Sequence, residues 1–140
     1  MSPVHATTVA CWVPATGWTG VMISGPSGSG KSDLALRLIG RGWRLVADDY
    51  SHVFASAGTL YAAPPARIAG RIEARGLGIV AVRHLGLARL VLAIDCGVQA
   101  PERLPEPDRV TVAGLDLPRL TLIARHASAV EIITAATAAL

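Results

Sequence analysis

The most informative part of this sequence is a glycine-rich stretch that reads Gly25-Pro26-Ser27-Gly28-Ser29-Gly30-Lys31-Ser32. It matches the phosphate-binding pattern G-x-x-x-x-G-K-[ST] at every fixed position. Its three glycines permit backbone angles that a side chain would forbid, so amide groups can point toward one anionic centre. Lys31 adds a positive charge for the outer phosphates of a nucleotide, and Ser32 offers a hydroxyl to Mg²⁺. A glycine-rich turn without a ligand is the alternative explanation.

The residues on either side of this loop favour a nucleotide site. Residues 21–24 form a short apolar run that predicts a strand, and residues 32–39 carry leucines at helical spacing and predict a helix. A strand, a loop and a helix in this order are the context that the phosphate-binding pattern requires. Lys31 is also the only lysine among 13 basic residues, which indicates that this position needs a compact ammonium group.

Composition and charge narrow the class of protein. With 140 residues, of which 51% are hydrophobic, the chain predicts one α/β domain with a buried core. Its net charge of +3 comes with scattered arginines, so nucleic acid is not an expected partner. No secretion signal opens the chain, and residues 85–98 are too short to span a bilayer, so we expect a cytoplasmic protein that binds no membrane. Cys11 and Cys96 lack metal-binding spacing, and we expect both to be reduced, buried thiols.

A second strand is predicted at residues 44–47, and it ends in Asp48 and Asp49. An acid at the carboxyl end of such a strand can reach Mg²⁺ or a nucleophile beside the γ-phosphate of a nucleotide. A solvated turn would also place two aspartates after a strand, since aspartate is common in turns. Their position, 16 and 17 residues after Ser32, favours the functional explanation.

The rest of the chain predicts more strands and one further helix. Strands are expected at residues 6–13, 51–55, 59–62, 88–94, 110–117 and 120–124, with the second and third forming a hairpin and 110–117 forming another. Residues 67–72 predict a short helical turn, and residues 128–139 predict the final helix.

Glu73 and Arg75 precede two glycines and a β-branched strand. From the residues alone, two explanations stay open. The acid could bind Mg²⁺ while the arginine offsets charge on a transferred phosphoryl group. An ordinary ion pair on the surface, before a glycine turn, would leave the same pattern.

Three segments together resemble the HPr kinase/phosphorylase family, and most closely its short alphaproteobacterial form. They are the phosphate loop, Leu45-Val46-Ala47-Asp48-Asp49, and Glu73-Ala74-Arg75-Gly76-Leu77-Gly78-Ile79. The third segment is the specific one, because phosphate loops occur in many families. The resemblance implies an α/β fold: a P-loop-containing, phosphoenolpyruvate carboxykinase-like mixed β-sheet with flanking helices. It also implies that residues 1–140 form a single catalytic domain, without the N-terminal domain of full-length members.

By this resemblance, the protein is expected to be a protein serine kinase that uses ATP and Mg²⁺. The implied substrate is an HPr-like phosphocarrier of the sugar phosphotransferase system, and inorganic phosphate is the implied co-substrate of a reverse, phosphorolytic reaction. A homo-oligomer is implied as well. Two other classes stay open on the residues: an ATP-binding sensor that transfers nothing, and a small-molecule kinase built on the same loop.

The resemblance also assigns roles to single residues. Gly25–Ser32 would bind the nucleotide, and Ser32 and Glu73 would bind Mg²⁺. Asp49 would accept the serine proton in the forward reaction and return it in the reverse reaction, and Asp48 would assist. The implied catalytic set further contains Lys31, His5, Arg75 and Arg125.

Overall fold

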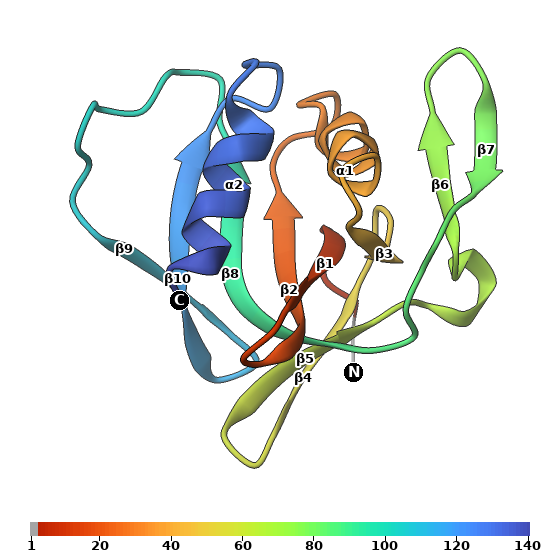
Figure 1. The fold of residues 1–140 in the computed structure, drawn as a ribbon, viewed down its shortest axis with the longest axis horizontal. Helices are drawn as coiled ribbons and strands as arrows, with labels where there is room; N and C mark the ends of the chain where they lie inside the picture. The colour runs from red at the N-terminus through yellow and green to blue at the C-terminus, as the bar shows by residue number, and fades with distance from the viewer. Residues whose placement is uncertain (1–2) are drawn as a thin grey trace.

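The structure is a computed structural model that describes residues 3–140, and its centre is a mixed β-sheet (Figure 1). The central strand order is β3-β1-β2-β8-β10-β9. These strands are β1 (Thr7–Val13), β2 (Gly17–Ser24), β3 (Arg44–Ala47), β8 (Ala88–Cys96), β9 (Asp108–Val112) and β10 (Leu115–Leu122). β8 runs parallel to β2 and β10, and the other neighbouring pairs are antiparallel. The expected mixed sheet is therefore present.

Two hairpins, two α-helices and one short 3₁₀ helix complete the fold. The strands of the hairpins are β4 (His52–Ser56), β5 (Thr59–Ala63), β6 (Arg71–Ala74) and β7 (Gly78–Ala81). The helices are α1 (Lys31–Ile39), α2 (Ala129–Ala138) and the short 3₁₀ helix η1 (Ala66–Ile68). The β4–β5 hairpin joins the sheet through β8, whereas β6–β7 forms a separate sheet that stands beside α1 and β3 (Figure 1).

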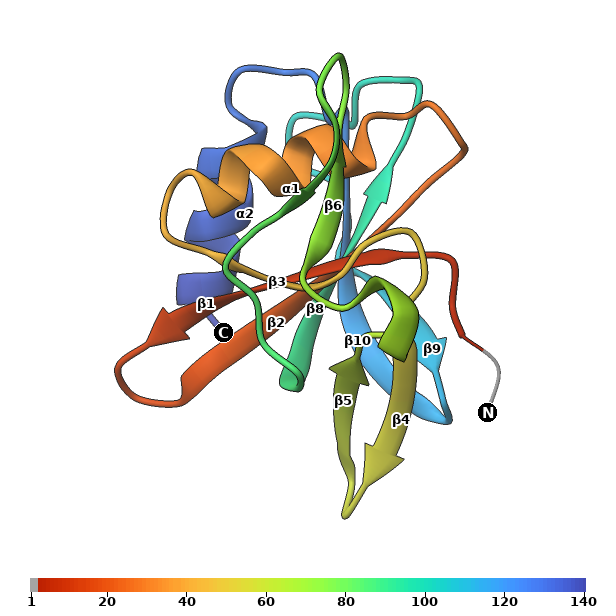
Figure 2. The same ribbon diagram turned by 90° about the vertical axis from the view of Figure 1, so that its right-hand side faces the viewer.

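The buried core has one part on each face of the sheet. Alternation along the strands produces this division: in β2, Val21 and Ile23 point to one face and Met22 points to the other. α1 and α2 pack on one face (Figure 2), where they meet Val9, Val21, Ile23, Leu45, Leu92 and Ile94. The β4–β5 hairpin packs on the other face, where it meets Ala10, Met22, Val46, Leu90 and Ala93. The loop between β2 and α1 therefore lies at the carboxyl end of a central strand, where the chain crosses to the helical face of the sheet.

The expected helical turn at residues 67–72 is wrong in its second half. Only Ala66–Ile68 is helical, and Arg71 and Ile72 already belong to β6. Gly70 has a φ of 74° and redirects the chain, after which the buried Ile72 pairs with Val80. The segment with Glu73 is therefore a strand of a hairpin, not a lead-in to one strand. Both strands have only four residues, so alternation along them is a weak signal in the sequence.

Other expectations differ from the structure in smaller ways. β2 begins at Gly17 instead of Val21, because its early residues pair with β1 up to the cross-strand pair Val13–Gly17. Cys96 is buried and free, as expected, but Cys11 is only half-buried near the end of the β1–β2 hairpin. Within residues 3–140, no helix is long and apolar enough to cross a membrane.

Candidate active site

The phosphate loop connects β2 to α1 and takes its shape from close packing. A Cβ added at Gly25 would lie 2.8 Å from the carbonyl oxygen of Cys96, so no side chain fits there. Gly30, directly before α1, has a φ of 94°, in the left-handed region that favours glycine. The start of α1, with its free amide groups and positive dipole end, therefore faces the loop, as an anion site requires.

Lys31 is folded into this loop and is only 7% exposed. Its Nζ donates to the carbonyl oxygens of Gly25 (2.8 Å) and Pro26 (3.0 Å). An ammonium group has three donors, so one donor remains for a phosphate oxygen. Ser29 Oγ is buried in the same loop and has no hydrogen-bond partner among the described residues. A buried hydroxyl without a partner costs free energy, which a ligand or a small loop adjustment would recover.

Asp48, at the end of β3, is a buried carboxylate that holds three elements together. Its Oδ1 accepts hydrogen bonds from Ser32 Oγ (2.7 Å) and Thr7 Oγ1 (3.0 Å), and its Oδ2 accepts one from the Glu73 amide (3.2 Å). The first bond orients the loop serine, and the third fixes the start of the Glu73 segment. Asp48 is thus placed to orient possible Mg²⁺ ligands.

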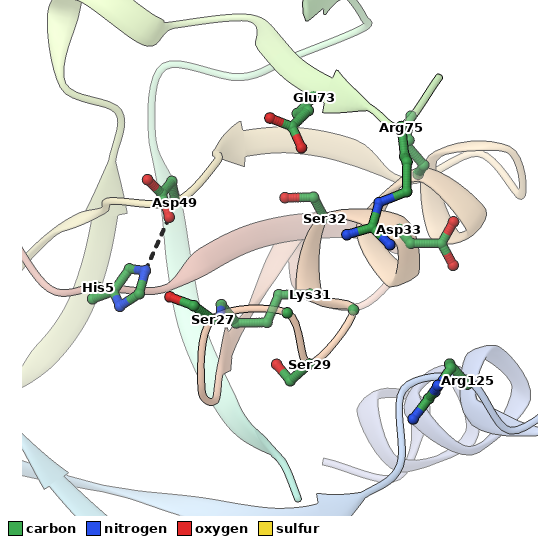
Figure 3. A pocket seen from close by; sticks show the side chains of 13 residues that line it. His5, Ser27, Ser29, Lys31, Ser32, Asp33, Asp49, Glu73, Arg75 and Arg125 are labelled. Atoms are coloured by element: carbon green, nitrogen blue, oxygen red, sulfur yellow. Dashed lines mark hydrogen bonds and ion pairs between the residues drawn. The ribbon is translucent and has the colours of Figure 1, made fainter. Parts of the chain in front are cut away.

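Asp49 differs from its neighbour, because its side chain is exposed and contacts a histidine. His5 Nε2 lies 2.9 Å from Asp49 Oδ1 (Figure 3), and the His5 ring also packs against Tyr50. The backbone is strained here. Asp49 has a φ of 67°, and the Tyr50 amide donates to the Asp48 carbonyl at 2.7 Å, as in the rarer γ-turn with positive φ. Backbone strain of this kind is often kept at functional sites.

The N-terminal segment reaches Asp49 because it is paired with the residues after β3. Val4 and Ser51 exchange two backbone hydrogen bonds of 2.7 and 2.9 Å. Buried Ser51 also bonds to Thr8 and to the Ala6 carbonyl through its hydroxyl. These contacts bring His5 to a residue that is 44 positions away in the sequence.

One cavity of about 410 Å³ collects most of the predicted site residues (Figure 3). Its lining consists of His5, Ser27, Gly28, Ser29, Gly30, Lys31, Ser32, Asp33, Leu36, Asp49, Glu73, Arg75 and Arg125. Glu73 and Arg75 enter from β6 and the turn after it, and Arg125 enters from the loop before α2. Of the predicted residues, Gly25, Pro26 and Asp48 lie outside this lining. Gly25 and Pro26 support Lys31, and Asp48 supports Ser32.

The surface-pair explanation of Glu73 and Arg75 gains no support from the structure. Within residues 3–140, no ion pair joins the two side chains, and both line the cavity of the phosphate loop. Thr7, by contrast, was missed by the sequence analysis. Its hydroxyl donates to Asp48 and accepts from the Asp49 amide (3.1 Å), so it links the two aspartates. A threonine in a predicted strand carries no local signal of such a role.

The donors at this site suit a magnesium ion carried by a nucleotide. In the part of the chain that the structure describes, no three His, Cys, Asp or Glu side chains form a metal cage. Mg²⁺ is usually held by one or two protein oxygens together with water and substrate phosphates. Ser32 and Glu73, which line one cavity with the loop, provide oxygens of that kind.

Cys96 lies directly behind the loop, and its burial raises the pKa of its thiol to about 11. The positive charge of Lys31 acts in the opposite direction but is the weaker influence. Cys96 therefore stays a neutral thiol near pH 7 and packs as a small apolar residue.

Comparisons with known proteins agree with this geometry. The profile of the HPr serine kinase C-terminal domain matches residues 5–93. The HPr kinase/phosphorylase of Geobacillus thermodenitrificans (strain NG80-2) is 38% identical over 119 residues, which are 76% of this chain and 38% of that protein. The HPr kinase/phosphorylase of Azoarcus sp. (strain BH72) is 38% identical over 117 residues, 74% of this chain and 37% of that protein. The chain thus spans less than two-fifths of these relatives.

A solved structure, the HPr(Ser) kinase/phosphatase of Coxiella burnetii, superposes with a TM-score of 0.77. The two sequences are 23% identical, and the aligned region covers 99% of this chain and 88% of the Coxiella burnetii chain. This likeness confirms the expected fold, a phosphoenolpyruvate carboxykinase-like mixed sheet with flanking helices. The fold and the loop define a P-loop domain of the mixed-sheet class. Within that class, the chain belongs to the HPr serine kinase C-terminal domain family.

Proposed function

We propose that this protein transfers the γ-phosphoryl group of ATP to a serine of an HPr-like phosphocarrier of the phosphotransferase system. One observation carries the proposal: a carboxylate, Asp49, is held by His5 at the wall of the cavity that contains the phosphate loop. A serine hydroxyl is a weak nucleophile, and a positioned base accelerates its attack by about 10²- to 10⁴-fold. A sensor that only binds ATP has no need of that base.

The chemistry assigns separate tasks to the residues of the cavity. The loop amides and Lys31 would bind the phosphates of ATP, and Ser32 and Glu73 would hold Mg²⁺, which neutralises charge on those phosphates. Asp49 would take the proton of the serine hydroxyl as its oxygen bonds to the γ-phosphorus. The bond between that phosphorus and the bridging oxygen to the β-phosphate breaks, and ADP leaves. Arg75 and Arg125 would offset negative charge on the transferred group.

The same residues would support phosphorolysis in the reverse direction. Inorganic phosphate would attack the phosphorus of the phosphoserine, and protonated Asp49 would return its proton to the serine oxygen. Atom balance then requires pyrophosphate as the second product. The proposal also includes a homo-oligomeric assembly and a location in the cytoplasm. Both follow from membership of the family.

Transfer from γ-labelled ATP tests this function. The purified protein would be incubated with labelled ATP, Mg²⁺ and an HPr carrier, and in parallel with small hydroxyl compounds. We expect label on a carrier serine, and none when that serine is replaced by alanine. Label on a small molecule would instead identify a small-molecule kinase, and ATP binding without any transfer would identify a sensor. Either result would contradict the proposal.

A further inference from the structure

A second cavity, of about 510 Å³, adjoins the cavity of the phosphate loop. Three residues, Ser32, Asp49 and Glu73, line both cavities. The rest of the second lining consists of Asp48, Tyr50, Arg67, Ile68, Arg71, Ile72 and Ile79. The proposed base and the proposed Mg²⁺ ligands therefore stand at the boundary between the two spaces.

This boundary matters because phosphoryl transfer places the attacking and leaving oxygens roughly in line. Under the proposed function, a nucleotide on the phosphate loop would fill the first cavity, and the acceptor hydroxyl would approach the γ-phosphate from the side facing away from the loop. The second cavity opens on Asp49 without any contribution from residues 25–31. It is thus positioned to receive the acceptor.

The second cavity has a distinctive charge pattern beyond the shared acids. Arg67, on η1, and Arg71, at the start of β6, are both exposed, and neither guanidinium has an ion-pair partner within residues 3–140. Both arginines belong to the segment that leads into the β6–β7 hairpin, and β6 lies beside β3, the strand that precedes Asp48 and Asp49 (Figure 2). Two unpaired guanidinium groups next to one acceptor path favour carboxylates on the approaching partner.

Exposed apolar residues accompany these charges. Tyr50 is 44% exposed and Ile79 is 64% exposed, although both line a cavity next to the reacting groups. Apolar surface with a few charged groups at its edge is the usual composition of a surface that another protein covers.

On this basis, and resting on the proposed function, we propose that Arg67 and Arg71 determine acceptor specificity. They would contact carboxylate side chains near the acceptor serine of the carrier protein, while Tyr50 and Ile79 cover apolar residues beside that serine. The two arginines act in acceptor binding and leave ATP binding to the phosphate loop.

Steady-state kinetics with an HPr carrier tests this inference. For Arg67→Glu/Arg71→Glu we expect the KM for the carrier to rise about tenfold or more, with a smaller rise for Arg67→Gln/Arg71→Gln. The kcat and the KM for ATP should stay within about twofold, and the effect should shrink at high salt. Arg103→Glu, in a loop outside both cavities, makes a matched change of charge and should have no effect. Replacing the contacted carrier acid by lysine should restore binding to the double Glu variant.

Two results would overturn the inference. Kinetics of Arg67→Glu/Arg71→Glu equal to those of Arg103→Glu would mean that the arginines do not contact the acceptor. A change confined to kcat or to the KM for ATP would mean that they only balance the charges of Asp48, Asp49 and Glu73. The control for folding is that each variant keeps the melting temperature and the ATP affinity of the unmodified protein. Failure of the proposed function looks different, because the unmodified protein would then transfer no phosphoryl group to the carrier.

Discussion

Asp48 and Asp49 are adjacent in the sequence, yet the fold gives them opposite environments. Asp48 is buried and accepts three hydrogen bonds, two from side-chain hydroxyls and one from the Glu73 amide. Asp49 is exposed and has a positive φ, and within residues 3–140 its carboxylate bonds to His5 alone. At the scale of the residue, this difference separates a structural acid from a candidate base. It also means that replacing the two acids should have different consequences for stability.

The first prediction concerns the stability of alanine variants at these two positions. Asp48→Ala leaves the Ser32 and Thr7 hydroxyls and the Glu73 amide without their acceptor, and should lower the free energy of unfolding by about 1–3 kcal/mol. Asp49→Ala removes an exposed contact with His5 and should change the free energy of unfolding by less than about 1 kcal/mol. Urea denaturation measures both values. Equal losses would show that Asp48 is not the hydrogen-bonding centre described above.

The second prediction concerns pH and Cys96. Burial raises the pKa of this thiol to about 11 from the usual 9.0, so the folded state holds the proton more tightly than the unfolded state. The associated stability is fully present below pH 9 and is lost as the pH rises toward 11. Urea midpoints between pH 8 and pH 11 should therefore fall more steeply for the unmodified protein than for Cys96→Ala. If the urea midpoints of the two proteins fell equally with pH, the raised pKa of Cys96 would be contradicted.

At the scale of the element, the turns of the β4–β5 and β9–β10 hairpins contain a correctable strain. Ala57 and Ala113 have φ values of 51° and 48°, a left-handed conformation in which the Cβ is unfavourable. Each is followed by a glycine, at positions 58 and 114, that also has a positive φ. Such turns favour asparagine, aspartate or glycine at the first position.

Ala57→Gly should therefore stabilise the protein by up to about 1 kcal/mol. Ala55→Gly is the matched control, because Ala55 lies within β4, where glycine costs about 0.5–1 kcal/mol. Thermal melting should move in opposite directions for the two variants. A lower melting temperature for Ala57→Gly would contradict the strained turn.

Arg37 connects two elements of the candidate site. From α1 it donates to the carbonyl oxygen of buried Ala124, on the loop that carries Arg125, and it also bonds Asp33 at 3.2 Å. A Cβ added at Gly30 would lie 3.3 Å from the Cβ of Ala124, so this loop packs directly on the phosphate loop. Arg37 is thus a positioning residue for Arg125.

We expect Arg37→Met and Arg125→Met each to slow phosphoryl transfer by at least about tenfold, because both disturb the placement of one charge. The double variant should be little slower than either single variant, since the two act as one unit. Arg41→Met is the control, because it breaks an exposed pair between Arg41, just after α1, and Glu131 on α2, away from the Arg125 loop. Additive effects of Arg37→Met and Arg125→Met would show that the two arginines act independently.

At the scale of the whole molecule, the features that could be predicted from the sequence are those formed by residues close together in the chain. The phosphate loop, the strand with its two acids and the β4–β5 hairpin could be identified because spacing, glycines and alternation carry their signals within a few residues. The mixed arrangement of the sheet came from the resemblance, since no local pattern states which strands are neighbours.

The parts that escaped local analysis depend on distant contacts. The pairing of Val4 with Ser51 brings His5 to Asp49, which is 44 positions away in the sequence. Thr7 acquires its role only because β1 lies beside β3. In each case one partner lies outside the window in which a pattern can be recognised.

The central claim is that Asp49 acts as the base in phosphoryl transfer to a serine. Single-turnover transfer from γ-labelled ATP to an HPr carrier, measured with Asp49→Asn, tests it most directly. Asparagine keeps the shape and tolerates the positive φ but cannot take a proton. We predict unchanged ATP affinity and a rate of transfer lower by at least about a hundredfold. A rate near that of the unmodified protein would contradict the account.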